Sequence, residues 1–246
     1  MGMGVGRCTV ALLVGALGFT AAPAASAHEV LPDLSMAKLI DLQQTRLSDG
    51  RPVLRFSTTI VNVGAGAFEV HGARTSPSEM SQTQRIFDST GTFRDVVTSG
   101  TMVFGGDGHN HWHVNNLATS ELFALNGNKV GTSNKRGFCF WDNIKYRLTL
   151  LGAPRSAFYQ AAGCGTLDSS AVAMGLSVGW GDEYAATVPD QYIDLTNVAL
   201  GRYRLQVTVD LQNWFAEINE ANNVTWVDLQ LRKQGQPKIL GYGPVA

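Results

Sequence analysis

Apolar and polar side chains alternate strictly along Tyr203-Arg204-Leu205-Gln206-Val207-Thr208-Val209-Asp210-Leu211. Successive residues of an extended chain point to opposite faces, so this period of two predicts a β-strand with one buried face. The same period recurs in residues 54–60 and 225–231. Glycine-containing breaks at 49–50, 64–66, 126–128 and 199–201 separate the apolar runs and indicate hairpins or loops.

This pattern predicts an all-β fold, namely an antiparallel β-sandwich with long loops and at most short helices. Residues 35–42 and 169–176 are the segments in which short helices are expected. The tail 233–246 contains several glycines and prolines, and we expect it to lie irregularly on the domain. The chain length of 246 residues is sufficient for one substantial hydrophobic core.

The first 27 residues have the pattern of a secretory signal peptide. A short start carrying Arg7 precedes an apolar stretch over 9–22, and Ala25-Ser26-Ala27 matches a processing site. The apolar stretch is too short to span a bilayer. We therefore expect residues 1–27 to be removed, the mature domain to comprise residues 28–246, and the protein to be secreted.

Charge and cysteine content narrow the classes of partner. The chain has 19 basic and 20 acidic residues, a balance that gives no electrostatic reason to expect nucleic acid or a membrane surface as a partner. Cys139 and Cys164 remain after the leader, and in an oxidising compartment they most economically form one disulfide. Metal binding by this pair is the weaker interpretation, since no C-x-x-C motif is present.

Three of the five histidines stand in the segment His109-Asn110-His111-Trp112-His113. In an extended chain, residues two apart share a face at roughly 6–7 Å, so three imidazoles can approach one ion. Three neutral imidazoles suit Zn, Cu, Fe or Ni, of which Cu(II) binds most tightly. We expect a metal site here, with Trp112 as a packing residue on the other face.

Several segments together resemble the lysyl oxidase family. The family's copper motif H-x-H-x-H carries an aromatic residue before its last histidine, as in 109–113, and its K-x-x-F-C-x-x-D segment is similar to 135–142. Residues 175–184 resemble its G-L-S and D-x-Y segment, and similarity continues through 191–196 and 201–205. Leu31-Pro32-Asp33-Leu34 resembles the start of the family's catalytic domain, so the resemblance spans nearly all of residues 28–246.

The resemblance implies a copper-dependent amine oxidase with a second cofactor made from the chain itself. Members join a lysine to an oxidised tyrosine to form lysine tyrosylquinone, and the matching positions here are Lys135 and Tyr184. Such enzymes use dioxygen to convert a primary amine or peptidyl lysine to an aldehyde, with release of ammonia and hydrogen peroxide. Asp182, two residues before Tyr184, is a candidate general base, although a structural role explains it equally well.

The family also binds calcium between the start and the end of the domain. The matching oxygen ligands here are Asp33, Leu34 through its carbonyl, Glu217, Asn219, Asn222 and Asn223. Such an ion would connect the first segment to the last hairpin and would have a structural role.

The chain also departs from the pattern of the animal enzymes. Gly108 stands where those enzymes have a cysteine before the first copper histidine, several further cysteines are missing, and 119–121 lacks a histidine found there in animals. Because of these differences, the substrate preference of the animal enzymes cannot be assigned to this chain. Small primary amines or accessible peptidyl lysine are therefore better candidates than collagen or elastin.

Three other functions remain open on the sequence. A non-catalytic secreted copper-binding protein could use the same sandwich without making the quinone. A copper mono-oxygenase could use His28 as an amino-terminal ligand, if a second histidine approached it. A zinc hydrolase would be active without dioxygen, but the chain has no H-E-x-x-H motif.

Overall fold

The computed structural model describes residues 1, 2, 4, 27–105, 110–233 and 235–246. The expected signal peptide lies almost entirely outside the described residues. Within the described part, regular structure consists of β-strands and two short 3-10 helices, η1 (Ala161–Cys164) and η2 (Glu220–Asn222). No helix of this part is long and apolar enough to cross a membrane. The all-β prediction is confirmed.

The strands form three sheets, and neighbouring strands in each are antiparallel. The seven-stranded sheet has the order β11-β8-β7-β6-β5-β13, with β1 paired to β6: β1 Glu29–Val30, β5 Phe68–Arg74, β6 Glu79–Asp88, β7 Phe93–Phe104, β8 Trp112–Asn115, β11 Gly137–Phe138 and β13 Ala171–Leu176. The five-stranded sheet has the order β10-β9-β16-β17-β18: β9 Ala118–Ala124, β10 Lys129–Thr132, β16 Arg202–Val209, β17 Val224–Gln230 and β18 Lys238–Tyr242.

The six-stranded sheet is organised around one long strand, β4. Its members are β2 Leu34–Met36, β3 Ile40–Arg46, β4 Pro52–Asn62, β12 Ile144–Lys145, β14 Trp180–Tyr184 and β15 Tyr192–Asp194. The second half of β4 pairs with β2 and β14, and its first half pairs with β3 and β15. Seven of the eleven residues of β4 form one continuous buried run at its carboxyl end, as expected for a strand covered on both faces.

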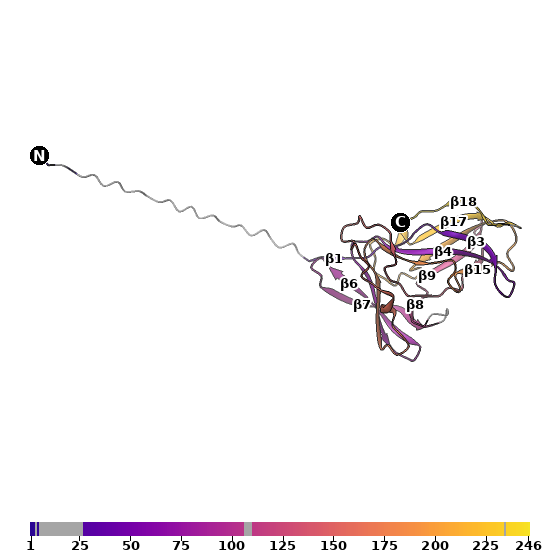
Figure 1. The fold of residues 1–246 in the computed structure, drawn as a ribbon, viewed down its shortest axis with the longest axis horizontal. Helices are drawn as coiled ribbons and strands as arrows, with labels where there is room; N and C mark the ends of the chain where they lie inside the picture. The colour runs from indigo at the N-terminus through magenta and orange to yellow at the C-terminus, as the bar shows by residue number, and fades with distance from the viewer. Residues whose placement is uncertain (3, 5–26, 106–109, 234) are drawn as a thin grey trace.

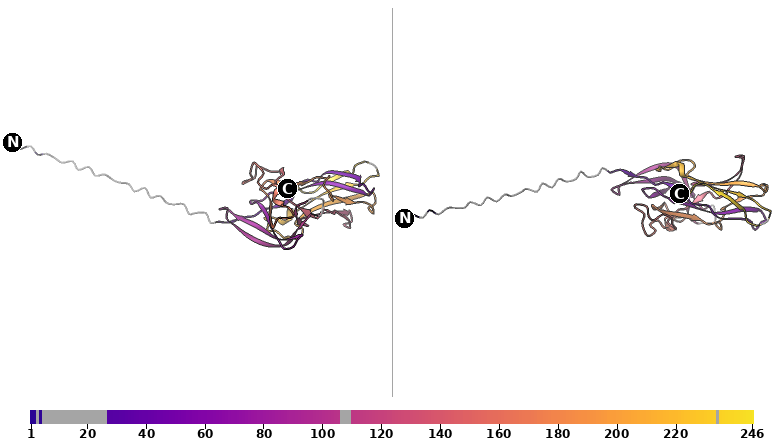
Figure 2. Two further views of the ribbon diagram at one scale, coloured as in Figure 1. Left: turned by 60° about the horizontal axis from the view of Figure 1, so that its bottom comes forward. Right: turned by 90° about the horizontal axis from the view of Figure 1, so that it is seen from above.

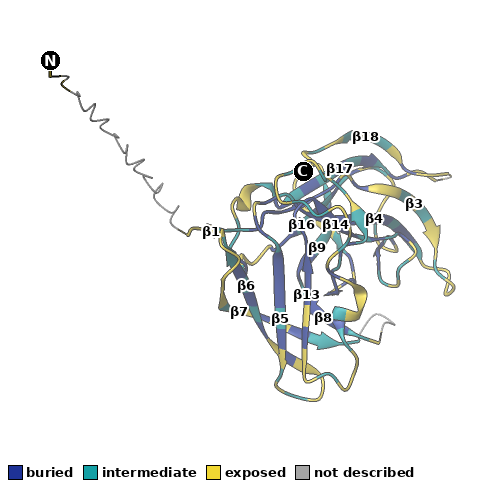
Figure 3. Ribbon diagram, turned by 60° about the vertical axis from the view of Figure 1, so that its left-hand side comes forward, coloured by how far each residue is buried: buried dark blue, intermediate teal, exposed yellow. Residues whose placement is uncertain are grey.

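Strands β3, β4, β9, β15, β17 and β18 of the five- and six-stranded sheets lie toward one end of the domain, and β1, β6 and β7 lie toward the other (Figure 1). Two further views show that the domain is flattened (Figure 2). Strand β5 is largely buried, whereas most residues of β7 are at least partly exposed (Figure 3). One hydrophobic core connects the sheets, and in it the ring of Phe68 lies 5.1 Å from that of Phe140 and 4.9 Å from that of Phe215.

The local sequence pattern predicted some of the secondary structure correctly and some of it wrongly. The three runs of period two correspond to β4, β16 and β17. The two expected short helices are wrong, because 35–42 contributes to β2 and β3 and 169–176 contributes β13. The tail also differs from expectation, because residues 238–242 pair with β17 as strand β18. In each case pairing with a distant strand decided the conformation.

Asn62, at the end of β4, joins three segments through one fully buried side chain. Its Oδ1 accepts hydrogen bonds from the backbone nitrogens of Asp33 (3.1 Å) and Gly64 (3.0 Å). Its Nδ2 donates to the carbonyls of Gly66 (2.8 Å) and Leu176 (3.0 Å). The side chain therefore satisfies four backbone groups that have little access to water.

We predict that Asn62→Ala lowers the free energy of unfolding by about 3 kcal/mol or more, since buried backbone groups would lose their partners. Asn197→Ala, at an exposed position with no side-chain hydrogen bond among the described contacts, should change it by less than about 0.5 kcal/mol. Denaturant titration of both variants measures the difference. Equal stability of the two variants would contradict the role given to Asn62.

Candidate active site

Four of the predicted site residues, His111, His113, Asp182 and Tyr184, line a hollow of about 160 Å³ between β8, β14 and the segment that follows β11. It is lined by His111, His113, Cys139, Trp141, Asn143, Ala161, Asp182, Glu183, Tyr184 and Val188. A larger hollow of about 470 Å³, next to Arg46 and Val53, contains none of the predicted active-site residues. The smaller hollow is therefore the candidate active site.

The two described histidines of the triplet lie side by side. His113 belongs to β8 and is 1% exposed, and its ring centroid lies 4.5 Å from that of His111. Trp112 between them is fully buried, and its Nε1 donates to the carbonyl of Thr166 at 2.8 Å, so it is a packing residue as predicted. His109 lies outside the described residues.

This donor set fits a transition-metal ion. Two imidazoles facing one hollow offer the neutral nitrogen ligands that copper or zinc prefers. The hollow between their rings and Tyr184 gives a bound ion access to small molecules. A metal site at this place therefore agrees with both the chemistry and the geometry of the described residues.

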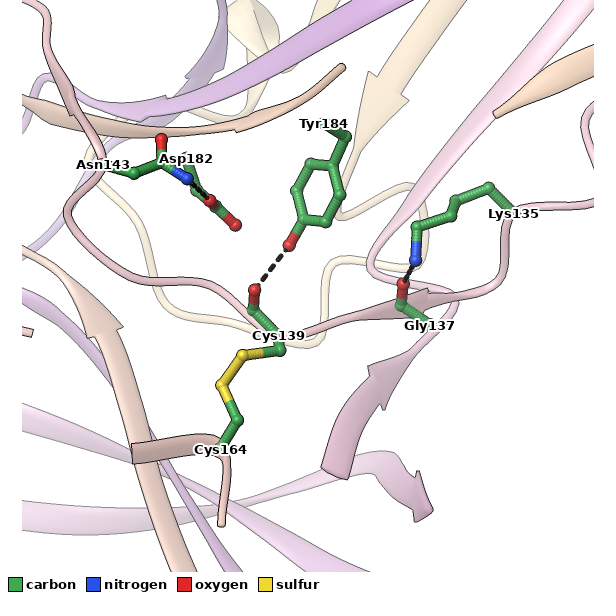
Figure 4. Close-up of a disulfide and its surroundings, with 7 residues drawn as sticks. All are labelled: Lys135, Gly137, Cys139, Asn143, Cys164, Asp182 and Tyr184. Carbon is green, nitrogen blue, oxygen red and sulfur yellow. Dashed lines mark hydrogen bonds between the residues drawn. A yellow bond between two sulfur atoms is a disulfide. The ribbon is translucent and has the colours of Figure 1, made fainter. Parts of the chain in front are cut away.

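Lys135 and Tyr184 lie together in the interior beside this hollow (Figure 4). Their side chains are 4% and 7% exposed, and the Lys135 amine lies 5.2 Å from the centre of the Tyr184 ring. The amine donates to the carbonyl of Gly137, and the tyrosine hydroxyl donates to the carbonyl of Cys139 at 2.8 Å. The backbone of residues 137–139 thus orients both side chains, while the ring of Phe138 packs edge-on against Tyr184 at 5.0 Å.

Gly137 connects Lys135 with the histidine strand. The residue pairs with Asn115 across the β8–β11 ladder, and its carbonyl accepts the Lys135 amine. A methyl group on its Cα would lie 2.8 Å from both Cβ and Cγ of His113, a distance that real side chains do not tolerate without movement. Glycine is therefore required here for β11 to approach His113 closely.

Asp182 lies two residues before Tyr184 on β14, so both side chains point to the same face of the strand. Asp182 is 1% exposed. Its Oδ1 accepts a hydrogen bond from the Asn143 amide. Its Oδ2 is also buried, and no described residue donates a hydrogen bond to it within normal distance and angle. Burial raises the pKa of its carboxyl well above the usual range, and the nearby Tyr184 hydroxyl, Asn143 amide and Lys135 charge offset only part of that rise. A carboxylate with a raised pKa holds a proton more firmly than a solvated one, which favours Asp182 as a proton acceptor.

A disulfide joins Cys139 to Cys164, as predicted. Cys139 lines the hollow, and its carbonyl accepts the Tyr184 hydroxyl. Trp112 contacts Thr166, two residues beyond Cys164, so the bridge and this hydrogen bond connect the tyrosine and histidine sides of the site to the same loop.

Most of the residues expected to bind calcium lie close together beside the carboxyl end of β4, where Asn62 accepts a hydrogen bond from Asp33 and pairs with Leu34. Glu217 accepts the backbone N–H of Leu34, and the Asn222 amide donates to Asp33 at 2.8 Å. The buried Oδ1 atoms of Asn222 and Asn223 accept no hydrogen bond from a described residue. Oxygen atoms of this kind fit a hard cation.

Asp210 and Glu220 were missed by the sequence reasoning, although both have a carboxylate oxygen within 4.8 Å of one on Glu217. Burial raises the pKa of Glu217 to about 9, and the charge of Glu220 adds to the rise. Asn219 instead caps η2, accepting the backbone N–H of Ala221 at 3.1 Å. Asp210 and Glu220 carried no local signal because the fold, not their spacing, places them beside Glu217.

The hollow at His28 bears on the mono-oxygenase alternative. It has a volume of about 250 Å³ and is lined by Ala27, His28, Glu29, Ile86, Asp88, Thr92, Phe93 and Arg94. Among the described residues no second histidine lines it. The structure gives this alternative no support.

Comparison with known proteins identifies the family. A family model described as lysyl oxidase matches residues 83–239, which is more than half of the chain. This range includes Lys135, Tyr184 and the histidine segment. The chain therefore belongs to the lysyl oxidase family.

Individual relatives match the chain at modest identity. Lysyl oxidase homolog 2 of Gallus gallus is 33% identical over 119 residues, which is 48% of this chain and 14% of the relative. Lysyl oxidase homolog 2B of Danio rerio is 25% identical over 207 residues, 81% of this chain and 24% of the relative. Lysyl oxidase homolog 2 of Bos taurus is 27% identical over 203 residues, 80% of this chain and 24% of the relative. The chain thus spans about a quarter or less of the length of these relatives.

Proposed function

We propose that this chain is a secreted, copper-dependent amine oxidase that converts primary amines or peptidyl lysine to aldehydes with dioxygen, releasing ammonia and hydrogen peroxide. The observation that carries the proposal is the buried Lys135 amine, 5.2 Å from the centre of the Tyr184 ring and beside the hollow of His111 and His113. Membership of the lysyl oxidase family supports an amine-oxidase-like enzyme.

His109, His111 and His113 would hold the copper ion. Copper(II) bound there would supply the redox chemistry that oxidises the nearby Tyr184 ring with dioxygen. The 4.5 Å separation of the His111 and His113 rings supports this assignment for the described pair. The burial of His113 would shield a bound ion from solvent on that side.

Lys135 and Tyr184 would form lysine tyrosylquinone, which supplies the electrophilic carbonyl and electron acceptor needed to oxidise an amine. The backbone carbonyls of Gly137 and Cys139 hold the amine and the ring in place before they join. Because both side chains are buried, the lysine meets this ring rather than an external electrophile.

Asp182 would accept the proton from the substrate carbon that bears the nitrogen. It shares the hollow with Tyr184, and Trp141, Ala161 and Val188 supply the apolar walls. A volume of about 160 Å³ admits a slender aliphatic amine, such as a lysine side chain, more readily than a bulky one.

Calcium would bind between Asp33, Leu34, Glu217, Asn222 and Asn223, with Asp210 and Glu220 close by. Two unsatisfied amide oxygens and a raised carboxyl pKa at Glu217 support a cation at this place. The ion would connect the segment of β2 to that of η2 and stabilise the fold.

Secretion is supported by the expected leader over 1–27 and by the Cys139–Cys164 disulfide, because disulfides persist mainly in oxidising compartments. We propose an extracellular location for the mature chain.

The test is peroxide and aldehyde release from butylamine and from a lysine peptide by residues 28–246 produced with copper. Tyr184→Phe should lower turnover by at least about 10³-fold, because no quinone can form. Tyr203→Phe is the matched control, since Tyr203 is 8% exposed and its hydroxyl likewise donates to a backbone carbonyl, that of Ala199. Copper binding without amine turnover would instead identify a non-catalytic copper protein, and activity without dioxygen would indicate a hydrolase.

We predict that Gly137→Ala weakens Cu(II) binding at least about tenfold, because the added methyl group displaces His113 and a ligand moved by even a few tenths of an ångström binds poorly. Gly241→Ala, where a methyl group would meet open space, should leave the affinity unchanged. Competition titration with a copper chelator measures both. Unaltered affinity in Gly137→Ala would remove His113 from the ligand set.

Calcium should stabilise the protein more at pH 8 than at pH 5.5. Without the ion, the folded state keeps Glu217 protonated up to about pH 9, whereas the unfolded chain loses this proton near pH 4.5, so rising pH in this window favours unfolding. Calcium binds the ionised carboxylate and therefore offsets this loss. About 10 mM calcium should add about 2 kcal/mol at pH 8.

Thermal unfolding of Glu217→Gln, with exposed Glu79→Gln as control, measures the calcium response. The Glu217 variant should lose the response and the control should keep it. A calcium response that persists in Glu217→Gln would contradict the site.

A further inference from the structure

Asn143 contacts three successive residues of β14. Its backbone nitrogen donates to the carbonyl of Gly181 at 3.1 Å. Its side-chain Oδ1 accepts the backbone N–H of Glu183 at 2.8 Å, and its Nδ2 donates to Oδ1 of Asp182. Figure 4 shows the amide of Asn143 directed at the carboxylate of Asp182. One side chain therefore connects the backbone of this strand with its buried carboxylate.

The orientation of the amide is determined by these contacts. The Glu183 backbone N–H can only donate, so it requires the carbonyl oxygen of Asn143 on its side. A flipped amide would place an NH₂ group against that N–H and an oxygen against the Asp182 carboxylate. Nδ2 is therefore held as a donor to Asp182.

Asn143 is itself held in place by its neighbour Asp142, which is 2% exposed. The Asp142 carboxylate accepts the backbone N–H groups of Phe158, Tyr159 and Ser177, and also the Ser177 hydroxyl at 2.7 Å. These bonds connect the segment before β12 to two other loops. The position of the Asn143 amide is thus set by structure outside β14.

We propose that Asn143 is a positioning residue that holds Oδ1 of Asp182 and so leaves Oδ2 as the oxygen that accepts the substrate proton. This inference rests on the proposed amine oxidation. In that step the C–H bond next to the substrate nitrogen breaks. Its proton would pass to Asp182, and its electron pair would pass through the substrate nitrogen to the lysine tyrosylquinone that Lys135 and Tyr184 would form and to which that nitrogen would be bonded. Rotation of the carboxylate would lengthen the proton's path, and Asn143 prevents that rotation.

The test compares Asn143→Ala and Asn143→Leu with wild type, using butylamine and butylamine deuterated at the carbon next to nitrogen. Both variants remove the donor, and leucine preserves the volume, so either variant that folds is informative. We expect kcat to fall about 10²-fold, KM to change by less than about threefold, and the deuterium isotope effect on kcat to rise. Quinone content, measured by hydrazine labelling, should stay that of wild type.

A merely structural role predicts a different result, namely lower quinone content or stability with an unchanged isotope effect per active site. That result, or kcat within about twofold of wild type, would overturn the inference. Asn128→Ala, at an exposed turn position, is the control for general effects of losing an asparagine. An active wild type with unaffected Asn143 variants overturns this inference alone, whereas a wild type that forms no quinone overturns the proposed function as well.

Discussion

The buried Lys135 amine beside the Tyr184 ring is the constraint on which the rest of the site depends. A lysine loses favourable hydration when it is removed from water, so its burial requires partners that the fold must supply. The carbonyl of Gly137 is such a partner, and the carbonyl of Cys139 holds the tyrosine in the same way. Residues 137–139 therefore determine the geometry of both side chains.

That short segment is held from two sides. Its β11 residues pair with β8, the strand that carries His113, and the disulfide ties Cys139 to the loop at Cys164. On the opposite side of the hollow, β14 presents Asp182 and Tyr184 from a strand paired with β4. The site thus lies between the seven-stranded and six-stranded sheets, and an error in the position of either would separate the groups that have to react.

The fold class and three long strands were predictable because period two is a local property. The strands in 35–42 and 169–176 were not, because their conformation comes from pairing with β4 and β5 rather than from their own short patterns. His111 and His113 line the same hollow as predicted, although only His113 belongs to a strand and His111 lies in the bend before β8. The proximity of Lys135 to Tyr184 followed only from family resemblance, since nothing in local sequence brings such distant residues together.

The same limit applies to the groups that the sequence reasoning missed. Asn143 has no motif of its own, and its importance appears only when its two side-chain hydrogen bonds to β14 are seen together. Asp210 and Glu220 acquire a place beside Glu217 through folding of the last loop. In each case a polar side chain gains its role from the fold around it.

The most direct test of the central claim is mass-spectrometric peptide mapping of residues 28–246 produced aerobically with copper. A cross-linked peptide pair that joins Lys135 to Tyr184, reacts with a hydrazine and disappears in His111→Ala is the result that this account predicts. Stoichiometric copper with both peptides separate and unmodified would contradict it, and the chain would then be a copper-binding member of the family without amine oxidase activity.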